Sequence, residues 1–283
     1  MTFFPVIVIY NIDIDRSKTC FNIRKIRNHD LKVIIVDNST VKNRNEEKSK
    51  KYGWKYISMN GNAGLSRAYN KALDFLKNEE GVVIWFDDDS EVTQKYFDVL
   101  EKNVHDNHDV DIFVPVIRGQ DGKFWSPNSA RLLKNKQLKN ENDVIRNSRF
   151  NAINSCMAVR LSLYNTYRYN EKLFLDQVDH NFCEDQRNAE RKFMKMNVVI
   201  QHSFSTKETQ KTMAELKARY SIMIPDFVVY SQKTRIRRAL CSIKVIGWGI
   251  REGIRNRQPL FIFWCIRELN NSLKQKSTTE YYS

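Results

Sequence analysis

The sequence predicts an α/β protein whose core is a mostly parallel sheet flanked by helices. Continuous apolar runs rich in β-branched residues, such as VIVIY at 6–10 and GVVIWF at 81–86, are typical of strands buried on both faces. Segments with helical spacing separate these runs, and this alternation implies right-handed crossovers between parallel strands. Hydrophobic residues make up 41% of the 283 residues, so a sizeable core can form.

The first hundred residues alternate regularly between strands and helices. The run KVIIVDNS predicts a second strand that ends at Asp37, and a short strand follows at 55–58. The sequence GNAGLSRAYNKALDFLKN then predicts a glycine-containing loop that opens a helix. The next strand, at 81–86, ends directly in three aspartates.

Beyond residue 111 the pattern is less regular. Strands are predicted at 111–116, 153–160 and 198–201, and helices at 179–195 and 208–220. The basic, Asn-rich region between the first two of these strands is expected to hold loops and a helix. We find no internal repeat or low-complexity tract before residue 230.

The segment 232–283 differs from the rest in charge. It holds 11 Lys or Arg against three Glu, so a net +8 of the chain's +14 lies here. Its apolar residues recur at spacings of four and three, which is one stripe of a helix, and the stripe consists of Ile236, Leu240, Ile243, Gly247, Ile250 and Ile254. Most cations lie off this stripe. Such a basic amphipathic segment could bind an anionic membrane, pack on the domain as a helical hairpin, or form a subunit interface.

Composition limits the class of protein. A net charge of +14 favours an anionic partner: nucleic acid, a phosphorylated small molecule or an acidic membrane. The five cysteines are scattered without a C-x-x-C pair, which favours reduced thiols in a cytosolic protein. The start MTFFPVIVIYNID does not resemble a signal peptide, and no apolar run approaches the roughly 20 residues that span a bilayer. We therefore expect a soluble or peripherally attached protein.

Polar side chains follow three of the predicted strands. Asn11 comes after the first, Asp37 ends the second, and Asp87, Asp88 and Asp89 follow the fourth. Ligands of open parallel sheets bind beyond the carboxyl ends of the strands. Crowded carboxylates at such an edge are costly unless a cation compensates them, and a divalent ion with oxygen ligands is the expected one.

The order of these segments resembles the GT-A glycosyltransferases of family 2, and within them the bacterial rhamnosyltransferase and galactofuranosyltransferase branch. The motifs are VIIVDNS, N-x-G at a helix start, and an apolar strand followed by D-x-D, and the resemblance covers about residues 5–205. It implies a catalytic domain at 1–231, with a donor half at about 1–115 and an acceptor half at about 116–231. The basic helical extension at 232–283 would follow it.

The resemblance also assigns the donor and metal sites. It implies that the nucleotide sugar is bound by Asn11, Asp37, Asn62, Gly64, Arg67, Asn70, Asp87 and Asp88. Asn11 and Asp37 would lie in the nucleoside pocket, and Arg67 would face the diphosphate from a helix N-terminus. Asp87, Asp89 and His202, which ends the run VVIQH, would ligate Mn²⁺ or Mg²⁺.

The segment LFLDQVDHNFCEDQR at 173–187 resembles the acidic segment that supplies the family's catalytic base. Asp179 matches the base, and Asp176 and His180 would support it. Aspartate is also a preferred helix N-cap, so a purely structural Asp179 stays open. The acceptor site would include Trp125, Asn154 and Ser155, although a tryptophan in such a domain is by default a core residue.

The resemblance implies an inverting, metal-dependent glycosyltransferase. It would move a sugar, with galactofuranose or rhamnose favoured, from a UDP or dTDP donor to a saccharide acceptor that is lipid-linked, in the synthesis of cell-surface polysaccharide such as capsule. The basic segment would hold the enzyme at the cytoplasmic face of the cell membrane, and a homodimer stays open.

Three other functions compete with the glycosyltransferase. A sugar nucleotidyltransferase normally has a glycine-rich, Lys-bearing loop where this chain has YNIDID. A nucleic-acid-binding protein should show a recognised motif, and we find none. An inactive sugar-binding protein is the third alternative, and assays of sugar transfer would identify it.

Overall fold

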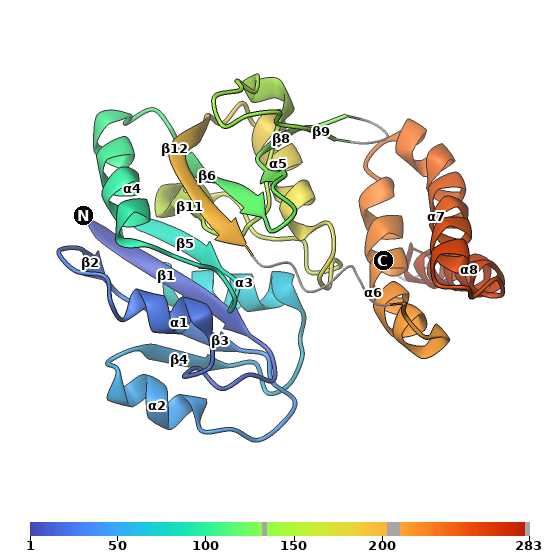
Figure 1. Ribbon diagram of the computed structural model, residues 1–283, viewed down its shortest axis with the longest axis horizontal. Coiled ribbons are helices and arrows are strands. Elements are labelled where there is room, and N and C mark those ends of the chain that lie inside the picture. The colour runs from blue at the N-terminus through green and yellow to red at the C-terminus, as the bar shows by residue number, and fades with distance from the viewer. Residues whose placement is uncertain (132–134, 203–209, 281–283) are drawn as a thin grey trace. The chain divides into compact units, whose positions relative to one another are not determined.

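The computed structural model describes residues 1–131, 135–202 and 210–280, without the side chains of His202 and of 275–280. The chain forms two compact units, each of which is described by itself. The first comprises residues 1–169 and 179–204, and the second comprises 170–178 and 205–283. Figure 1 shows the elements of both units.

The first unit is built on a twisted central sheet with the strand order β12-β6-β11-β5-β1-β3-β4, in which β2 also pairs with β1 and β7 with β6. Strand β1 pairs in parallel with β3 and β5, and β6 pairs in parallel with β12. Strand β11 runs antiparallel to both of its neighbours, so β5 and β6 run in the same direction. The strands are β1 (Thr2–Ile9), β2 (Asp30–Leu31), β3 (Ile34–Asp37), β4 (Lys55–Ser58), β5 (Val82–Phe86), β6 (Ile112–Gly119), β7 (Phe124–Ser126), β11 (Met157–Arg160) and β12 (Phe193–His202).

Helices cover both faces of this sheet. Successive residues of a strand point to opposite faces, and since all residues of β5 are buried, both faces must be covered. Trp85 of β5 stacks against Tyr69 of α3, and the next residue, Phe86, contacts Tyr96 of α4. Helices α3 and α4 therefore lie on opposite faces. The helices of this unit are α1 (Lys18–Ile23), α2 (Asn45–Lys51), α3 (Leu65–Phe75), α4 (Gln94–Asp106) and α5 (Val178–Asn188, whose first residue belongs to the second unit).

A small antiparallel sheet with the order β10-β8-β9 lies in the region between β7 and β11. Its strands are β8 (Asn128–Ser129), β9 (Lys136–Gln137) and β10 (Phe150–Asn151). The 3₁₀ turn η1 (Asn147–Arg149) leads into β10, and the 3₁₀ turn η2 (Leu161–Asn165) follows β11. The sequence pattern predicted loops and a helix for this region, whereas the described residues form short strands and 3₁₀ turns.

The predicted α/β class and mostly parallel sheet are confirmed, with shifts at element ends. The helix predicted at 179–195 ends at Asn188, because the chain turns at Glu190 with a φ of +57° and β12 begins at Phe193. Strand β12 is longer than predicted, and its pairing with β6 shifts register between Lys195 and Val199. That irregularity interrupts the alternating pattern from which strands are predicted.

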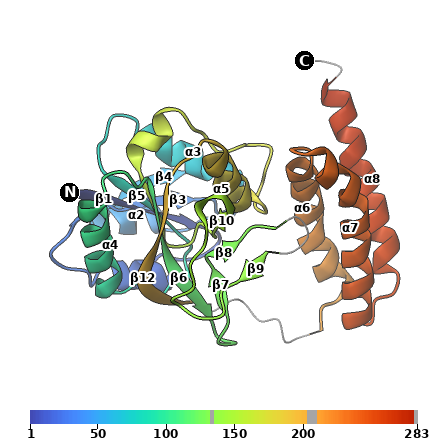
Figure 2. The same ribbon diagram turned by 90° about the horizontal axis from the view of Figure 1, so that it is seen from above.

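The second unit is a bundle of the helices α6 (Met213–Ser231), α7 (Arg235–Arg255) and α8 (Phe261–Glu280) (Figure 2). Its core includes Ile224 of α6, Val245 of α7 and Phe261 of α8, each fully or almost fully buried. Gly249 lets α7 and α8 approach closely, since a Cβ there would lie 3.0 Å from the Ile262 Cα. Helix α6 thus belongs to the same unit as the segment 232–283. The boundary between 231 and 232, which was drawn from the sequence, stays a prediction.

Helix α7 forms where the sequence predicts it, but the predicted apolar stripe is not the face that packs. The buried residues of α7 include Cys241, Val245 and Gly249, on the side of the helix opposite the stripe. The isoleucines of the stripe are 47–76% exposed. This unit thus leaves an apolar helix face in water.

Two further observations concern the chain as a whole. All five cysteines are buried and unbridged. Within the described residues, no helix combines the length and hydropathy that crossing a bilayer requires.

Candidate active site

The carboxyl ends of the parallel strands meet at one edge of the central sheet. Asp37 is the last residue of β3, Asp87 follows β5, and Gly119 ends β6. His202 ends β12 and is the register partner of Gly119. The backbone of His202 therefore lies at the same edge, whereas its side chain is outside the described part, and its metal ligation stays a prediction.

The acidic loop after β5 is held in place through its backbone. Thr19 Oγ1 donates to the Asp87 carbonyl at 2.5 Å, and Ser17 Oγ donates to the Asp88 carbonyl at 2.7 Å. The N–H of Ser90 donates to Thr19 Oγ1 at 2.9 Å, so the loop is tied to the start of α1 on both sides. The loop is therefore fixed through its main-chain groups.

The carboxylates of this loop are electrostatically crowded. Burial, together with the neighbouring charges of Asp89, Asp88 and Asp179, raises the pKa of Asp87 to about 7, and a hydrogen bond with Ser155 acts in the opposite direction. Burial and the charge of Asp89 likewise raise the pKa of Asp88. Carboxyls that resist ionisation in this way would be stabilised as carboxylates by a cation.

Asp179 belongs to the same cluster, although it lies about 90 positions further along the chain. It is in the first turn of α5, and its Oδ1 accepts the N–H of His180 at 2.7 Å. The charge of Asp179 reaches both Asp87 and the buried phenol of Tyr69. The fold thus brings the residue that the sequence predicts as the base next to the D-x-D segment.

The predicted nucleoside residues are held in place by hydrogen bonds. Asp37 is 2% exposed and accepts hydrogen bonds from the Ser39 N–H at 2.8 Å, Tyr56 Oη at 2.9 Å and Asn45 Nδ2 at 3.1 Å. Burial raises the pKa of Asp37, but these hydrogen bonds outweigh it and hold the pKa below its usual value. Asn11, at a φ of +52°, accepts the Thr40 N–H at 2.9 Å and so joins the loops after β1 and β3.

The N-x-G loop is built as the start of α3. Gly64 is the N-cap at a φ of +90°, which favours glycine, and its N–H donates to Asn62 Oδ1 at 3.3 Å. Asn38 ties this loop to the end of β3 by donating to the Gly64 carbonyl and accepting the Ala63 N–H. Arg67 is exposed in the first turn of α3.

Asn70 has a structural use in this fold. It is 7% exposed, its Nδ2 donates to the Tyr169 carbonyl at 3.0 Å, and its Oδ1 accepts the Tyr169 N–H at 2.9 Å. The amide therefore holds the two backbone polar groups of Tyr169, and its predicted donor contact stays a prediction.

Two of the predicted acceptor residues border the acidic loop. Ser155 Oγ hydrogen bonds with Ser90 Oγ at 2.9 Å. Asn154 is 4% exposed, and within the described residues neither polar atom of its amide makes a hydrogen bond of standard geometry. Since an unsatisfied buried amide is costly, the Asn154 side chain is suited to bind a polar group of a ligand.

Trp125 lies on β7 at the same edge of the sheet. Its Nε1 donates to Asp121 Oδ1 at 3.1 Å, and its ring covers Gly119, where an added Cβ would come within 2.4 Å of Nε1. Trp125 is half-buried, so it is neither a core residue nor fully exposed. Its contact with an acceptor stays a prediction.

Asp176, the other predicted support, belongs to the second unit, in which Arg219 of α6 binds both of its carboxylate oxygens at 2.5 and 2.6 Å. Asp226 of α6, 2% exposed, accepts the N–H groups of Phe174, Leu175 and Asp176 at 2.6–2.8 Å. Sequence reasoning did not identify Arg219 or Asp226. No motif marked them, because their partners lie about 50 residues away in the sequence.

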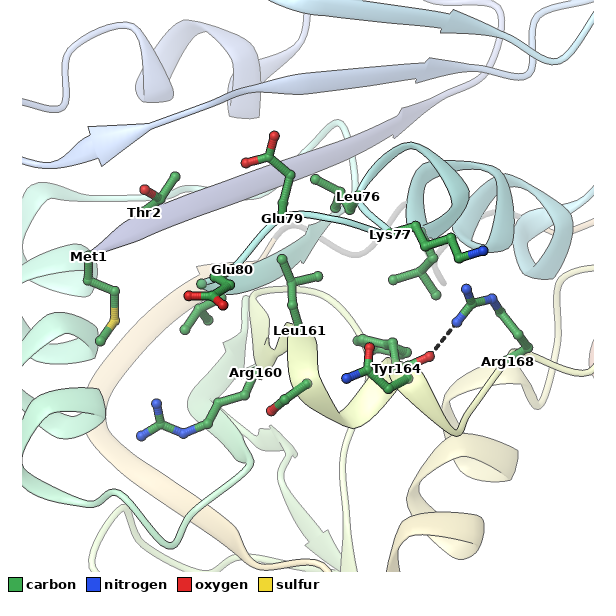
Figure 3. Close-up of a pocket in the computed structure, with 15 residues that line it drawn as sticks. Met1, Thr2, Leu76, Lys77, Glu79, Glu80, Arg160, Leu161, Tyr164 and Arg168 are labelled. Carbon is green, nitrogen blue, oxygen red and sulfur yellow. Dashed lines mark hydrogen bonds between the residues drawn. The ribbon is translucent and has the colours of Figure 1, made fainter.

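A different cavity lies at the opposite edge of the sheet (Figure 3). Its volume is about 680 Å³, and its lining includes Thr2 and Val82, where β1 and β5 begin, and Arg160, where the antiparallel β11 ends. Because it lies at the amino ends of the parallel strands, it is separate from the cluster of carboxylates described above.

The comparison with protein families decides the class of this site. The model of glycosyl transferase family 2 matches residues 6–168, which is more than half of the chain. The chain belongs to glycosyl transferase family 2. Its fold is that of the GT-A glycosyltransferases, and its family is one of glycosyltransferases. No curated protein matches this family 2 chain in sequence.

Solved structures show the same fold at low sequence identity. A mannosyltransferase from Pyrobaculum calidifontis, in complex with GDP-Man and Mn²⁺, is 12% identical with a TM-score of 0.56 over 98% of this chain and 75% of its own. A fragment of S. aureus TarS in complex with UDP-GlcNAc is 15% identical with a TM-score of 0.51, over 92% and 75% of the two chains. The chain spans 44% of the longer S. aureus TarS structure.

A third structure is the glucosyl-3-phosphoglycerate synthase of Mycobacterium tuberculosis with Mn²⁺, UDP-glucose and phosphoglyceric acid. It is 13% identical with a TM-score of 0.51, over 81% of this chain and 79% of its own. This structure and that of the mannosyltransferase thus each contain a nucleotide sugar together with Mn²⁺.

The residues present fit a divalent metal by their chemistry. Asp87 and Asp89 offer hard oxygen ligands. The raised pKa of Asp87 indicates that a nearby cation would stabilise its ionised form. Among the described side chains, no three His, Cys, Asp or Glu converge closely enough to enclose an ion by themselves. A metal at this edge would thus rely on ligands beyond those side chains, such as His202 or the donor's diphosphate.

Proposed function

We propose that this chain transfers a sugar from a nucleoside-diphosphate donor to a saccharide acceptor with inversion, and that Asp179 is the catalytic base. The supporting observation is that Asp179 and the D-x-D carboxylates share one electrostatic cluster at the carboxyl edge of the sheet. The donor is a UDP or dTDP sugar, with galactofuranose or rhamnose favoured. The acceptor is a lipid-linked saccharide of a cell-surface polysaccharide.

The reaction makes one bond and breaks one. The acceptor hydroxyl oxygen attacks the anomeric carbon from the face opposite the diphosphate, while the bond between that carbon and the diphosphate oxygen breaks. The hydroxyl proton passes to Asp179, and the electron pair leaves with the diphosphate. Asp37 and Asn11 hold the nucleoside, and Asn154 and Ser155 orient the acceptor beside the base.

Asp87 and Asp89, with His202, would hold Mn²⁺ or Mg²⁺. When bound, the ion supplies Lewis-acid stabilisation of negative charge on the leaving diphosphate.

Substituting the base tests this assignment. Asp179→Asn should lower turnover by about 10²- to 10⁴-fold and leave donor binding largely intact, because only proton removal is lost. Asp74→Asn is a matched control, since Asp74 is exposed on α3 with a single 4.0 Å ion pair to Arg168. Transfer from a panel of UDP and dTDP sugars, with donor affinity measured by calorimetry, gives the result. Unchanged turnover in Asp179→Asn would show that another group is the base.

We also propose that the enzyme docks peripherally on the cytoplasmic face of the membrane through α7 and the start of α8. The exposed apolar stripe of α7 supports this: Ile243 and Ile254 are 67% and 76% exposed, on the side opposite the helix's packed face. Leu260 and Phe263 add further exposed apolar surface at the start of α8.

The charges beside this stripe favour an anionic bilayer over a second protein chain. Arg235, Arg251 and Arg255 are exposed on α7, and Arg267 is exposed on α8. An apolar helix face bordered by arginines is suited to insert at the headgroup level of a membrane that carries anionic lipids.

A further inference from the structure

A second pocket, of about 550 Å³, is lined by five cationic side chains of the first unit. We call it the basic pocket, and its cations are Arg131, Lys136, Lys139, Arg146 and Arg149. It shares no lining residue with the acidic cluster or with the cavity at the amino ends of the strands. The glycosyltransferase site described above does not account for it.

Secondary structure brings three of these cations to one end of the small sheet. Lys136 of β9 is the register partner of Ser129 in β8, which in turn faces Phe150 of β10. Arg149 immediately precedes Phe150, and its carbonyl accepts the Ala130 N–H at 2.7 Å, next to Arg131. Lys136 on β9, Arg131 just after β8 and Arg149 just before β10 thus lie at the same end of the ladder.

The remaining two cations are Lys139, in the bend after β9, and Arg146, the N-cap of η1. The 3₁₀ turn η1 places Arg149 three residues after Arg146, and the Arg149 N–H donates to the Arg146 carbonyl at 2.9 Å. Arg146 is the N-cap of this turn and Arg149 its last residue, and both line the pocket. Asn147 fixes the turn by donating to the Arg191 carbonyl and accepting the Phe193 N–H.

Among the described residues, the positive charge of the basic pocket is only partly offset, by the carboxylate of Asp143, whose charge reaches Lys136. Asp143 is the carboxylate in its lining, and its Oδ2 accepts the Lys139 N–H at 2.7 Å and lies 3.4 Å from the Asn140 N–H. Within the part of the chain that the structure describes, none of the five cations forms a salt bridge within 4.0 Å. Five cations against one carboxylate repel one another unless an anion enters.

We propose that the basic pocket binds a phosphate or diphosphate group, and that this group belongs to the acceptor rather than to the sugar donor. Three of the five cations are arginines, whose planar forks bind two phosphate oxygens at once. The donor's diphosphate is assigned to the acidic edge, where a metal compensates its charge. The link to the acceptor rests on the proposed function, whereas binding of the anion does not.

Binding of inorganic pyrophosphate, measured by calorimetry at low salt with EDTA present, tests the site itself. EDTA removes the metal through which pyrophosphate would bind the acidic edge. Arg146→Ala with Arg149→Ala should weaken binding by roughly tenfold to a hundredfold, because two charge-assisted contacts are lost. The matched control is Lys95→Ala with Lys102→Ala, which removes two exposed cations from α4.

Each outcome of that measurement decides the site. Normal affinity in the control and weak binding in the pocket variant would support it. Absence of binding by the unchanged protein, equal affinity in the pocket variant, or equal losses in both variants would overturn it, the last because net charge alone would then explain binding. If the double alanine variant unfolds, Arg146→Lys with Arg149→Lys replaces it, and a loss of affinity at constant charge is expected.

A second arm separates a phosphate on the acceptor from a free phosphate ligand. Transfer is measured with one saccharide acceptor in its phosphate-bearing and dephosphorylated forms. The pocket variant should raise KM for the first form alone, with kcat little changed. Equal KM changes for both forms would overturn the assignment to the acceptor. If neither form is glycosylated while pyrophosphate binding depends on the basic pocket, the proposed function fails and the anion site stands.

Discussion

The exposed stripe of α7 makes membrane docking measurable without disturbing the fold. In the double variant Ile243→Ser with Ile254→Ser, two side chains that already contact water become polar. The packed face of the helix, with Val245 fully buried, is untouched. We therefore expect an unchanged thermal unfolding midpoint together with weaker binding to vesicles.

The size of the effect follows from the exposed fractions. Complete burial of an isoleucine side chain is worth about 1.5–3 kcal/mol. At exposed fractions of 67% and 76%, each side chain has roughly 1–2 kcal/mol left to gain on insertion. Losing both would weaken membrane partitioning by about 2–4 kcal/mol, which is roughly 30- to 1000-fold.

The assay is sedimentation of the full chain with vesicles of mixed anionic and neutral lipid. The matched control, Phe21→Ser with Phe75→Ser, removes two residues of the first unit that are 48% and 47% exposed, and it should bind vesicles normally. The unchanged protein should bind vesicles of neutral lipid less, because these lack anionic headgroups for the arginines. It should also bind the mixed vesicles less at high salt, because salt screens the attraction between the arginines and the headgroups.

Two results would refute this reasoning. Equal vesicle binding by the stripe variant and the unchanged protein would show that the stripe does not enter the bilayer. A lowered unfolding midpoint, or a shift from dimer to monomer in the stripe variant, would show that the face is covered by protein instead.

Three further predictions follow from the described geometry. Asp89→Asn should abolish the rise in melting temperature that Mn²⁺ and a nucleotide sugar produce, and an undiminished rise would remove Asp89 from the metal site. Gly81→Ala should lower the free energy of unfolding by about 1–3 kcal/mol through the strain of its φ of +141°. The clash of the added Cβ, 2.3 Å from the Thr2 carbonyl oxygen, should add to this loss, and chemical denaturation measures the total. The folded-state pKa of Asp37 is below its usual value of 3.8, so its contribution to stability is present above that value and lost as pH falls through the folded pKa. The stability gap between the unchanged protein and Asp37→Asn should accordingly shrink between about pH 6 and about pH 3 in denaturation curves.

Local pattern was sufficient for the class of fold and for most elements. Buried strands are recognisable in the sequence as continuous runs of β-branched residues. The strand at 55–58 and the helix that starts at Leu65 form where the pattern predicts them. The acidic triplet was recognisable as well, because three carboxylates directly after a buried strand are unusual. These signals are local, so a single sequence carries them.

Other features depend on partners far apart in the chain. The apolar stripe of α7 was correctly predicted, but which face packs depends on α6 and α8, and it is the face of Val245. Likewise, Thr19 holds the Asp87 carbonyl across 68 positions, and Asp226 caps a segment about 50 residues away. No periodicity marks such contacts.

The amino-acid order alone was enough to specify the α/β sheet, the acidic strand end and the basic amphipathic helix, because each is written in neighbouring residues. Tertiary structure determined which other residues these residues contact. It placed the charge of Asp179 close to Asp87 and brought five cations to the lining of one pocket. It also let the Asn70 amide hydrogen bond with the backbone of Tyr169. The physical reason is that pKa shifts, hydrogen-bond satisfaction and burial are set by spatial neighbours, which only the folded chain brings together.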